Sequence, residues 1–352
     1  MTALLNPAVK NYEWGDYAAL PDLLGAPRDE KPWAELWFGT HPDGHATLQT
    51  ENGVSPLKSV VGDLSFLVKL IAVAKPLSLQ THPSTAQALV GYVRENTLGV
   101  DRTAPNRVYR DQTAKPELLC ALSKFEMLCG FAPVEQSLAL AKQNGWTELA
   151  RQLQISGLER CVRWALGDQS QTVPKNLPMN LPKHLQTLAS LYPNSGGLVV
   201  ALLMNHVVLQ PGDAVFLEPG NVHSYLSGMA VEVMPSSDNV IRAAFTTKHI
   251  DIDAFIAIAN FIPEAPRSVT PPTNVGDTAT YKIPSAPFGV QRINVKNAMS
   301  VEAEHEVELY LCVQGHAGSL RQGQACILRH NETLHLAGPS LVFRVWGDPT
   351  RA

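Results

Sequence analysis

The chain reads VVLQPGDAVFLEPG at residues 207–220. This stretch contains two short runs of strand-forming residues, and each run ends in Pro-Gly, a dipeptide that favours a tight turn. Short strands joined by such turns are typical of a jelly roll. His223 follows the second turn at the start of another short strand, so the stretch that indicates the fold also places an imidazole at a strand end.

A row of polar side chains lies on an earlier strand, which reads LSLQTHP at residues 77–83. Alternation along an extended strand sends Ser78, Gln80 and His82 to one face and leaves Leu77 and Leu79 for the core. Because the strand otherwise looks buried, this polar row calls for a functional explanation.

Two further segments supply groups of the same kind. Lys115-Pro116-Glu117 places a carboxylate after a polar turn, and His223 provides a second imidazole. Imidazole, amide and carboxylate groups are N and O ligands that suit a divalent ion such as zinc. We therefore predict a metal site made of Gln80, His82, Glu117 and His223.

The rest of the chain predicts a mainly β fold with an α-helical insertion. Residues 1–120 contain short extended runs, interrupted by one helix that begins with the capping-box sequence Ser84-Thr85-Ala86-Gln87. Apolar residues recur at helical spacing between about 125 and 195, a block that includes the proline-rich stretch 173–182. Strands resume at Leu198. After a proline-rich connector that begins near residue 262, strand-like runs at 308–313 and 324–328 predict a second, C-terminal jelly roll.

Composition excludes several classes of function. The net charge of -4, without a basic run that carries interleaved aromatic residues, disfavours binding to nucleic acid. The chain shows neither a leader pattern nor an apolar run of membrane-spanning length, so we expect a cytoplasmic protein with no membrane partner. The five cysteines form no CxxC pair and fit reduced, mostly buried thiols.

The motifs, in this order and spacing, resemble those of type I mannose-6-phosphate isomerases, a family of zinc-dependent cupin enzymes. The resemblance extends over most of the chain. It is carried by NYEWG at 11–15, AELWFGTHP at 34–42, FLVK at 66–69, AKPLSLQTHP at 74–83, KPE at 115–117, HSYLSG at 223–228, SDNVIR at 237–242 and TTK at 246–248.

This resemblance implies a role for each matching residue. The zinc ligands fall on the four residues of the predicted metal site, Gln80, His82, Glu117 and His223. Arg242 matches the catalytic arginine of the family. Two residues help to hold the substrate phosphate, Ser78 and Lys248, and three line the sugar pocket, Lys69, Lys115 and Asp238.

The family plan also implies three parts of the chain. These are a catalytic cupin domain at 1–122 and 196–262, a helical domain at 123–195, and a C-terminal cupin-like β domain at 263–352 that carries no metal. One departure concerns the chemistry, because the family usually has Asn-His ahead of Lys-Pro-Glu and this chain has Thr113-Ala114. We therefore assign the acid/base role to Lys115, and Asp238 joins Arg242 and Lys115 in the catalytic set.

The resulting hypothesis is a zinc-dependent isomerase that interconverts mannose 6-phosphate and fructose 6-phosphate through an enediol. Two alternatives stay open: a metal-dependent cupin oxygenase with a 2-His-1-carboxylate iron site, and a sugar-phosphate-binding protein without activity. We expect a monomer whose partner is a small-molecule sugar phosphate. The histidines outside the metal site, His41 among them, are interpreted as structural or exposed.

Overall fold

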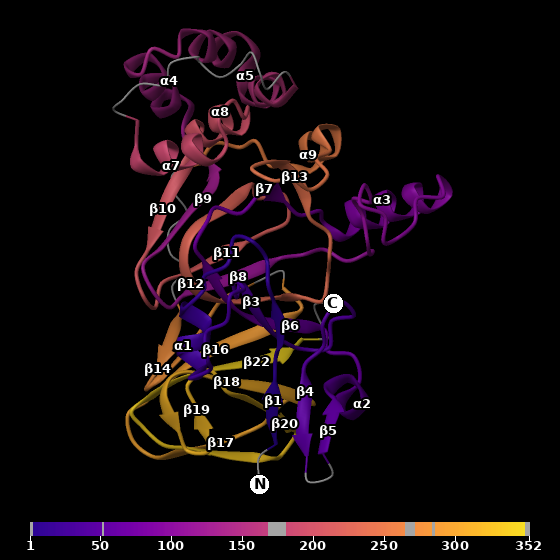
Figure 1. The fold of residues 1–352 in the computed structure, drawn as a ribbon, viewed down its shortest axis with the longest axis vertical. Coiled ribbons are helices and arrows are strands. Elements are labelled where there is room, and N and C mark those ends of the chain that lie inside the picture. The colour runs from indigo at the N-terminus through magenta and orange to yellow at the C-terminus, as the bar shows by residue number, and fades with distance from the viewer. Residues whose placement is uncertain (1–2, 51–52, 168–180, 265–271, 284–285, 349–352) are drawn as a thin grey trace.

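The chain folds mainly into β-sheets, with a group of helices at one end of the molecule (Figure 1). The computed structural model describes residues 3–50, 53–167, 181–264, 272–283 and 286–348. The group of helices consists of α4 (Val134–Gln143), α5 (Thr147–Gly167), α7 (Lys183–Leu191) and α8 (Gly197–Leu202). The described residues also form the helices α1 (Ala19–Leu24), α2 (Leu57–Val61), α3 (Thr85–Thr97) and α9 (Ile252–Ile258). The predicted fold class, mainly β with a helical insertion, is confirmed.

One large sheet carries the predicted site. Its strands are β2 (Ala8–Lys10), β3 (Glu35–Phe38), β6 (Phe66–Val73), β7 (Leu79–Thr81), β8 (Glu117–Ala121), β9 (Phe125–Phe131), β10 (Met204–Leu209), β11 (Ala214–Leu217), β12 (His223–Pro235) and β13 (Ile241–Ala244). The long strand β12 pairs with β6, β7, β8 and β9, always antiparallel. The two predicted Pro-Gly turns flank β11, and their glycines Gly212 and Gly220 have φ of 95° and 83°, a region that favours glycine.

A second large sheet contains the C-terminal strands. It is formed by β1 (Leu4–Asn6), β4 (Thr47–Thr50), β5 (Gly53–Pro56), β14 (Thr273–Val275), β15 (Thr278–Thr280), β16 (Phe288–Val295), β18 (Val307–Ala317), β19 (Leu320–Arg321), β20 (Ala325–Arg329) and β22 (Ser340–Gly347). The strands β17 (Met299–Glu302) and β21 (Thr333–Leu336) form a separate pair. Leu36 and Phe66 of the first sheet lie in one apolar cluster with Phe288 and Leu309 of the second. The N-terminal strand β1 pairs with β20, and the domain boundaries given above stay a prediction.

Three local predictions are wrong. One helix was expected within residues 1–120, but α1 and α2 lie there as well as α3. Residues Phe125–Phe131 were expected in the helical block, but they form β9, whose backbone pairs with β10 and β12. Residues from Leu198 were expected to form a strand, but Gly197–Leu202 is the helix α8, all of it buried. A short apolar run that is buried on every side has no periodicity that separates a helix from a strand. The proline-rich stretches 173–182 and 263–272 lie largely outside the described residues.

The helix α3 follows the predicted metal strand and begins as the sequence predicts. The Ser84 hydroxyl accepts a hydrogen bond from the Gln87 backbone N–H, and the Gln87 side chain accepts one from the Ser84 backbone N–H, which completes the capping box. Three apolar residues that recur at helical spacing after the cap, Leu89, Val90 and Val93, are nevertheless exposed. The helix packs through Gly91 instead, because a side chain at that position would clash with the ring of Tyr109.

Replacing Ser84 with alanine is expected to lower the free energy of unfolding by about 1 kcal/mol, since the first turn of α3 loses its cap. Ser84→Asp, which preserves an acceptor at the cap, is the matched control. Urea unfolding followed by circular dichroism measures the difference. An alanine variant as stable as the wild type would show that the cap does not stabilise the chain after His82.

Candidate metal centre

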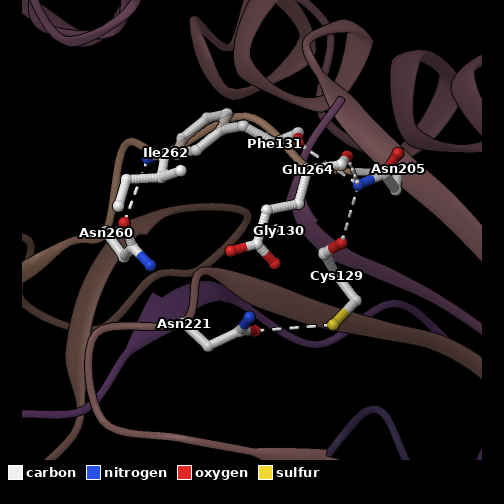
Figure 2. Close-up of a pocket in the computed structure, with 8 residues that line it drawn as sticks. All are labelled: Cys129, Gly130, Phe131, Asn205, Asn221, Asn260, Ile262 and Glu264. Atoms are coloured by element: carbon white, nitrogen blue, oxygen red, sulfur yellow. Dashed lines mark hydrogen bonds between the residues drawn. The ribbon is translucent and has the colours of Figure 1, made fainter. Parts of the chain in front are cut away.

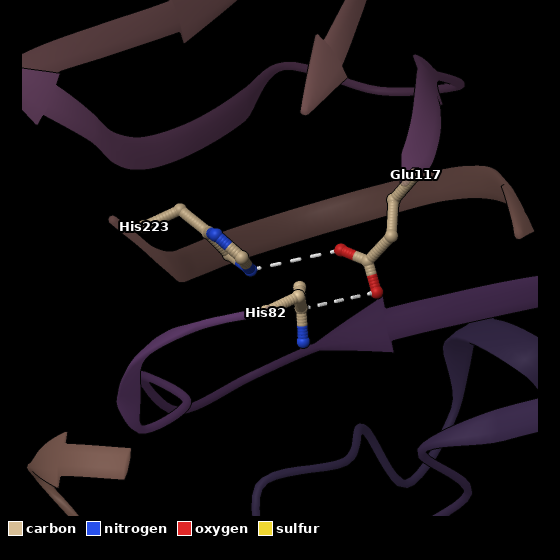
Figure 3. Close-up of side chains that lie close together, drawn as sticks. All are labelled: His82, Glu117 and His223. Atoms are coloured by element: carbon tan, nitrogen blue, oxygen red, sulfur yellow. Dashed lines mark ion pairs between the residues drawn. The ribbon is translucent and has the colours of Figure 1, made fainter. Parts of the chain in front are cut away.

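The ends of three strands bring the predicted metal ligands together. His82 directly follows β7, Glu117 is the first residue of β8, and His223 is the first residue of β12. His223 is the pairing partner of Gln80 on β7, which fixes how these strand ends approach one another. Figure 3 shows the two imidazoles facing the Glu117 carboxylate.

The three side chains form a compact buried cluster. His82 Nε2 lies 3.4 Å from Glu117 Oε1, and His223 Nε2 lies 3.6 Å from Glu117 Oε2. One ligand atom from each residue lies within 4.8 Å of the other two. All three side chains are at most 2% exposed. Three polar groups this close together in a buried site are expected to hold a single cation between them.

The tautomers of both histidines are set by the backbone. His82 Nδ1 lies 2.7 Å from the carbonyl oxygen of Asn239, and His223 Nδ1 lies 3.1 Å from that of Asn221. Because a carbonyl can only accept, each Nδ1 carries a proton and each Nε2 presents a lone pair to the cluster. The buried Nε2 of His82 makes no hydrogen bond within the described part of the chain. Metal-binding histidines are usually oriented in this way by a partner of the other ring nitrogen.

The fourth predicted ligand, Gln80, lies beside this cluster. Its Nε2 is 3.3 Å from His223 Nε2, and its Oε1 accepts a hydrogen bond of 2.8 Å from the Ser78 hydroxyl. Rotation of the amide by half a turn would exchange its oxygen and nitrogen without moving the side chain. Ser78, predicted to bind phosphate, is here a neighbour of the metal cluster.

The charges around the cluster keep its members in the state that binds a cation. Burial opposes ionisation of Glu117. The Lys115 ammonium forms an ion pair with this carboxylate, and together with the two imidazoles it holds the pKa of Glu117 well below the usual range. Burial and the Lys115 charge lower the pKa of His82, and burial is the main cause that lowers the pKa of His223 to about 4, although the Glu117 charge opposes both shifts. The carboxylate is therefore ionised and both imidazoles are neutral at pH 7.

A second buried network adjoins the metal cluster, and sequence reasoning missed most of it. Tyr225 donates to Glu232 Oε1 at 2.8 Å, and its oxygen lies 3.3 Å from Glu117 Oε2. Lys69 Nζ lies 3.1 Å from Glu232 and 3.8 Å from Glu35. Burial opposes the charge on Lys69, but Glu35 and Glu232 raise its pKa.

A signal for this network is visible in the sequence. Glu35, Lys69 and Glu232 are each a single charged residue inside an apolar strand sequence, AELWF, FLVKLI and AVEVM respectively. Lys69 and Glu232 are direct pairing partners across β6 and β12. A charged residue in an apolar strand is expected to have a buried partner of opposite charge.

The remaining predicted residues lie on the segment that follows β12. Arg242 pairs with Gln80 across β13 and β7, so Arg242, Gln80 and His223 form one cross-strand row. Burial and the nearby Arg110 guanidinium lower the pKa of Arg242, and burial and Arg242 lower that of Lys248. Neither Arg242 nor Lys248 forms an ion pair with the described residues, so these cations are available to an anion.

One small cavity lies behind the metal cluster rather than within it. Its volume is about 10 Å³, room for about one water molecule. Figure 2 shows the Glu264 carboxylate pointing into it. Asn221, whose carbonyl orients His223, is one of the residues that line this cavity. None of the predicted site residues lines it.

Comparison with known proteins identifies relatives along nearly the whole chain. The family model for the phosphomannose isomerase type I catalytic domain matches residues 3–134. Mannose-6-phosphate isomerase of Salmonella typhimurium is 31% identical over 367 residues, which cover 95% of this chain and 94% of the relative. The Homo sapiens protein of the same name is 28% identical over 377 residues, covering 88% of this chain and 87% of the relative.

Solved structures agree with these relatives. A mutant of phosphomannose isomerase from Salmonella typhimurium superimposes with a TM-score of 0.89 at 28% identity and covers 99% of both chains. A zinc-bound mannose 6-phosphate isomerase gives a TM-score of 0.89 at 26% identity over 99% of both chains. The sequence match and the fold match therefore extend over the same, nearly complete length.

Proposed function

Because the chain belongs to the type I phosphomannose isomerase family, we propose that Gln80, His82, Glu117 and His223 hold the zinc ion with which it interconverts mannose 6-phosphate and fructose 6-phosphate. The observation that carries this assignment is the convergence of two Nε2 lone pairs on one ionised carboxylate in a buried site. Zinc is commonly bound by such a set of nitrogen and oxygen ligands. The family relationship argues against the oxygenase and against the inactive binding protein.

The proposed ligand set suits the chemistry of the reaction. Moving a proton between C1 and C2 of a sugar phosphate passes through an enediol, with negative charge developing on O1 and O2. When bound, zinc supplies a Lewis acid for these oxygens. The set contains one carboxylate and three neutral ligands, so it offsets only part of the charge of a divalent ion. The neutral amide of Gln80 thus leaves the site attractive to an anionic substrate.

Lys115 is our candidate for the group that moves the proton. Its buried ammonium lies beside Glu117 at the edge of the metal cluster. The residue ahead of it is Ala114, so the turn carries no imidazole at that position. An amine is able to serve as general acid and base when it is held within reach of the reacting carbon.

The cationic residues near Gln80 are proposed to bind the rest of the substrate. Arg242 and Lys248 have no carboxylate partner among the described residues. We assign both cations, together with Ser78, to binding the substrate phosphate. We also assign the two cations to stabilising the negative charge that develops on the sugar oxygens. Lys69 and Asp238 are assigned to the sugar pocket. The ion pairs of Lys69 with Glu35 and Glu232 hold two carboxylates in place for sugar hydroxyls.

We further propose that the protein works as a cytoplasmic monomer with the three domains given above, 1–122 with 196–262, 123–195, and 263–352. All five cysteines are buried thiols, which suits a reducing compartment. No helix among the described residues is both long enough and apolar enough to cross a membrane.

The experiment that tests this function is removal and return of the metal. The purified protein is expected to convert mannose 6-phosphate in a coupled assay, to lose activity when zinc is chelated, and to regain it when zinc is added back. Elemental analysis measures about one zinc per chain. Iron in the purified protein with oxygen consumption would favour the oxygenase, and binding of mannose 6-phosphate without turnover would favour the inactive binding protein.

A further inference from the structure

A buried imidazole outside the metal cluster contacts one of the predicted sugar-pocket residues. His41, which follows β3, is 1% exposed, and its Nε2 lies 3.4 Å from Asp238 Oδ1. Its Nδ1 accepts a hydrogen bond of 3.2 Å from the Asp43 backbone N–H. The proton of the neutral ring is therefore on Nε2, which donates toward Asp238.

The ring of His41 is held in this orientation by its neighbours. Trp37 packs edge-on against it, with ring centroids 4.9 Å apart and an interplanar angle of 76°. The indole N–H of Trp37 donates to Glu35, and Lys69 lies over the indole ring with its Nζ 5.0 Å from the ring centroid. His41 is thus packed against the buried charge network of β3 and β6 rather than free to rotate.

The backbone of Asp238 is fixed from the other side. Its N–H donates to Asp111 Oδ2 at 2.8 Å, and the next residue, Asn239, presents the carbonyl that orients His82. The side chain of Asp238 stays 22% exposed, so its carboxylate reaches the surface of the site. Burial opposes ionisation of this carboxyl group, but the hydrogen bond from His41 and the nearby cations lower its pKa.

We propose that His41 is a positioning residue, which holds the Asp238 carboxylate in one orientation so that it accepts a hydrogen bond from a sugar hydroxyl. The proposal rests on the function given above, in which Asp238 lines the sugar pocket. His41 lies 197 positions before Asp238, and no local motif links the two. The imidazole that contacts this carboxylate thus comes from the segment after β3, whereas the position next to Lys115 carries only Ala114.

Two substitutions separate positioning from simple packing. His41→Gln keeps a donor near the place of Nε2, whereas His41→Asn keeps an acceptor for the Asp43 N–H but loses the donor to Asp238. We expect His41→Asn to lower kcat/KM for mannose 6-phosphate by about tenfold to a hundredfold, mainly through KM, because a hydrogen bond to a charged group is lost. His41→Gln is expected to recover most of this loss. Both variants should retain the zinc content of the wild type.

A double-mutant cycle with Asp238→Asn completes the test. If His41 acts through Asp238, adding His41→Asn to the Asp238→Asn variant should cause little further loss. Equal activity of the Asn and Gln variants, or losses that multiply in the double variant, would overturn the proposal. Should His41→Asn fail to fold, the same cycle is run with His41→Gln. Its loss of kcat/KM should then vanish in the Asp238→Asn background, and a loss that persists there in full would overturn the proposal. A wild-type protein without zinc or turnover would instead count against the proposed function.

Discussion

Glu117→Gln is expected to abolish stable zinc binding and to reduce turnover of mannose 6-phosphate by on the order of a thousandfold, the equivalent of several kcal/mol of lost charge stabilisation. The amide has nearly the shape of the carboxylate, so the packing around it changes little. What is lost is the negative charge that faces Lys115, His82 and His223 in a buried site. A cation placed there would meet the Lys115 ammonium without a compensating carboxylate.

The matched control is Glu308→Gln, which removes a buried carboxylate from the C-terminal sheet. Glu308 accepts hydrogen bonds of 2.6 Å and 2.7 Å from Arg344. Breaking this buried ion pair is expected to lower the stability by about 3–5 kcal/mol, yet zinc content and turnover of the folded protein should not change. Elemental analysis and the coupled assay measure both variants. Normal zinc content in Glu117→Gln would mean that the cation binds elsewhere.

The cluster of ligands was predictable because its signals are local. Alternation on residues 77–83 placed Gln80 and His82 on one face, and the structure shows both beside His223. The Pro-Gly turns fixed the short strands before His223 by backbone preference alone. The family resemblance named from these motifs is confirmed by relatives that match nearly the whole chain.

The supporting network was not predictable from the same signals. The carboxylate of Asp111 binds the backbone and side chain of the segment 237–239, more than 120 positions later in the chain. Asn239 in turn orients His82 through its carbonyl, which any residue possesses. Contacts of this kind depend on the tertiary fold and leave no spacing in the sequence. The short apolar segment of α8 was misassigned for a related reason, because burial on all sides removes its periodicity.

The ion pairs of the site follow a common arrangement. Lys69 is paired with Glu232 on the neighbouring strand β12, and Lys115 is paired with Glu117 two residues later in the chain. Arg242 and Lys248 form no ion pair with the residues that the structure describes, and they lie on the segment after β12, where Asp238 is also partly exposed. The cations that have buried carboxylate partners are therefore distinct from the two cations that we propose for the phosphate.

Lys115→Met is expected to reduce turnover by about a hundredfold to ten-thousandfold, the usual contribution of a general acid or base, while zinc stays bound. The thioether fills much of the space of the lysine stem but carries no proton to exchange. Lys115→Arg is the matched control, because it preserves the positive charge beside Glu117 but does not lose its proton in proteins. If Lys115 moves the proton, arginine should not restore activity. If only the positive charge of Lys115 matters, arginine should restore most of the activity.

Exchange of the substrate C2 hydrogen with solvent deuterium gives a direct measurement of the proton transfer. The wild type is expected to incorporate deuterium during turnover, and both Lys115 variants should lose this incorporation to the same degree as they lose turnover. A general loss of substrate binding would instead raise KM and leave both the exchange rate and kcat at saturating mannose 6-phosphate unchanged. Near-normal turnover of Lys115→Met with intact zinc content would exclude Lys115 as the acid/base.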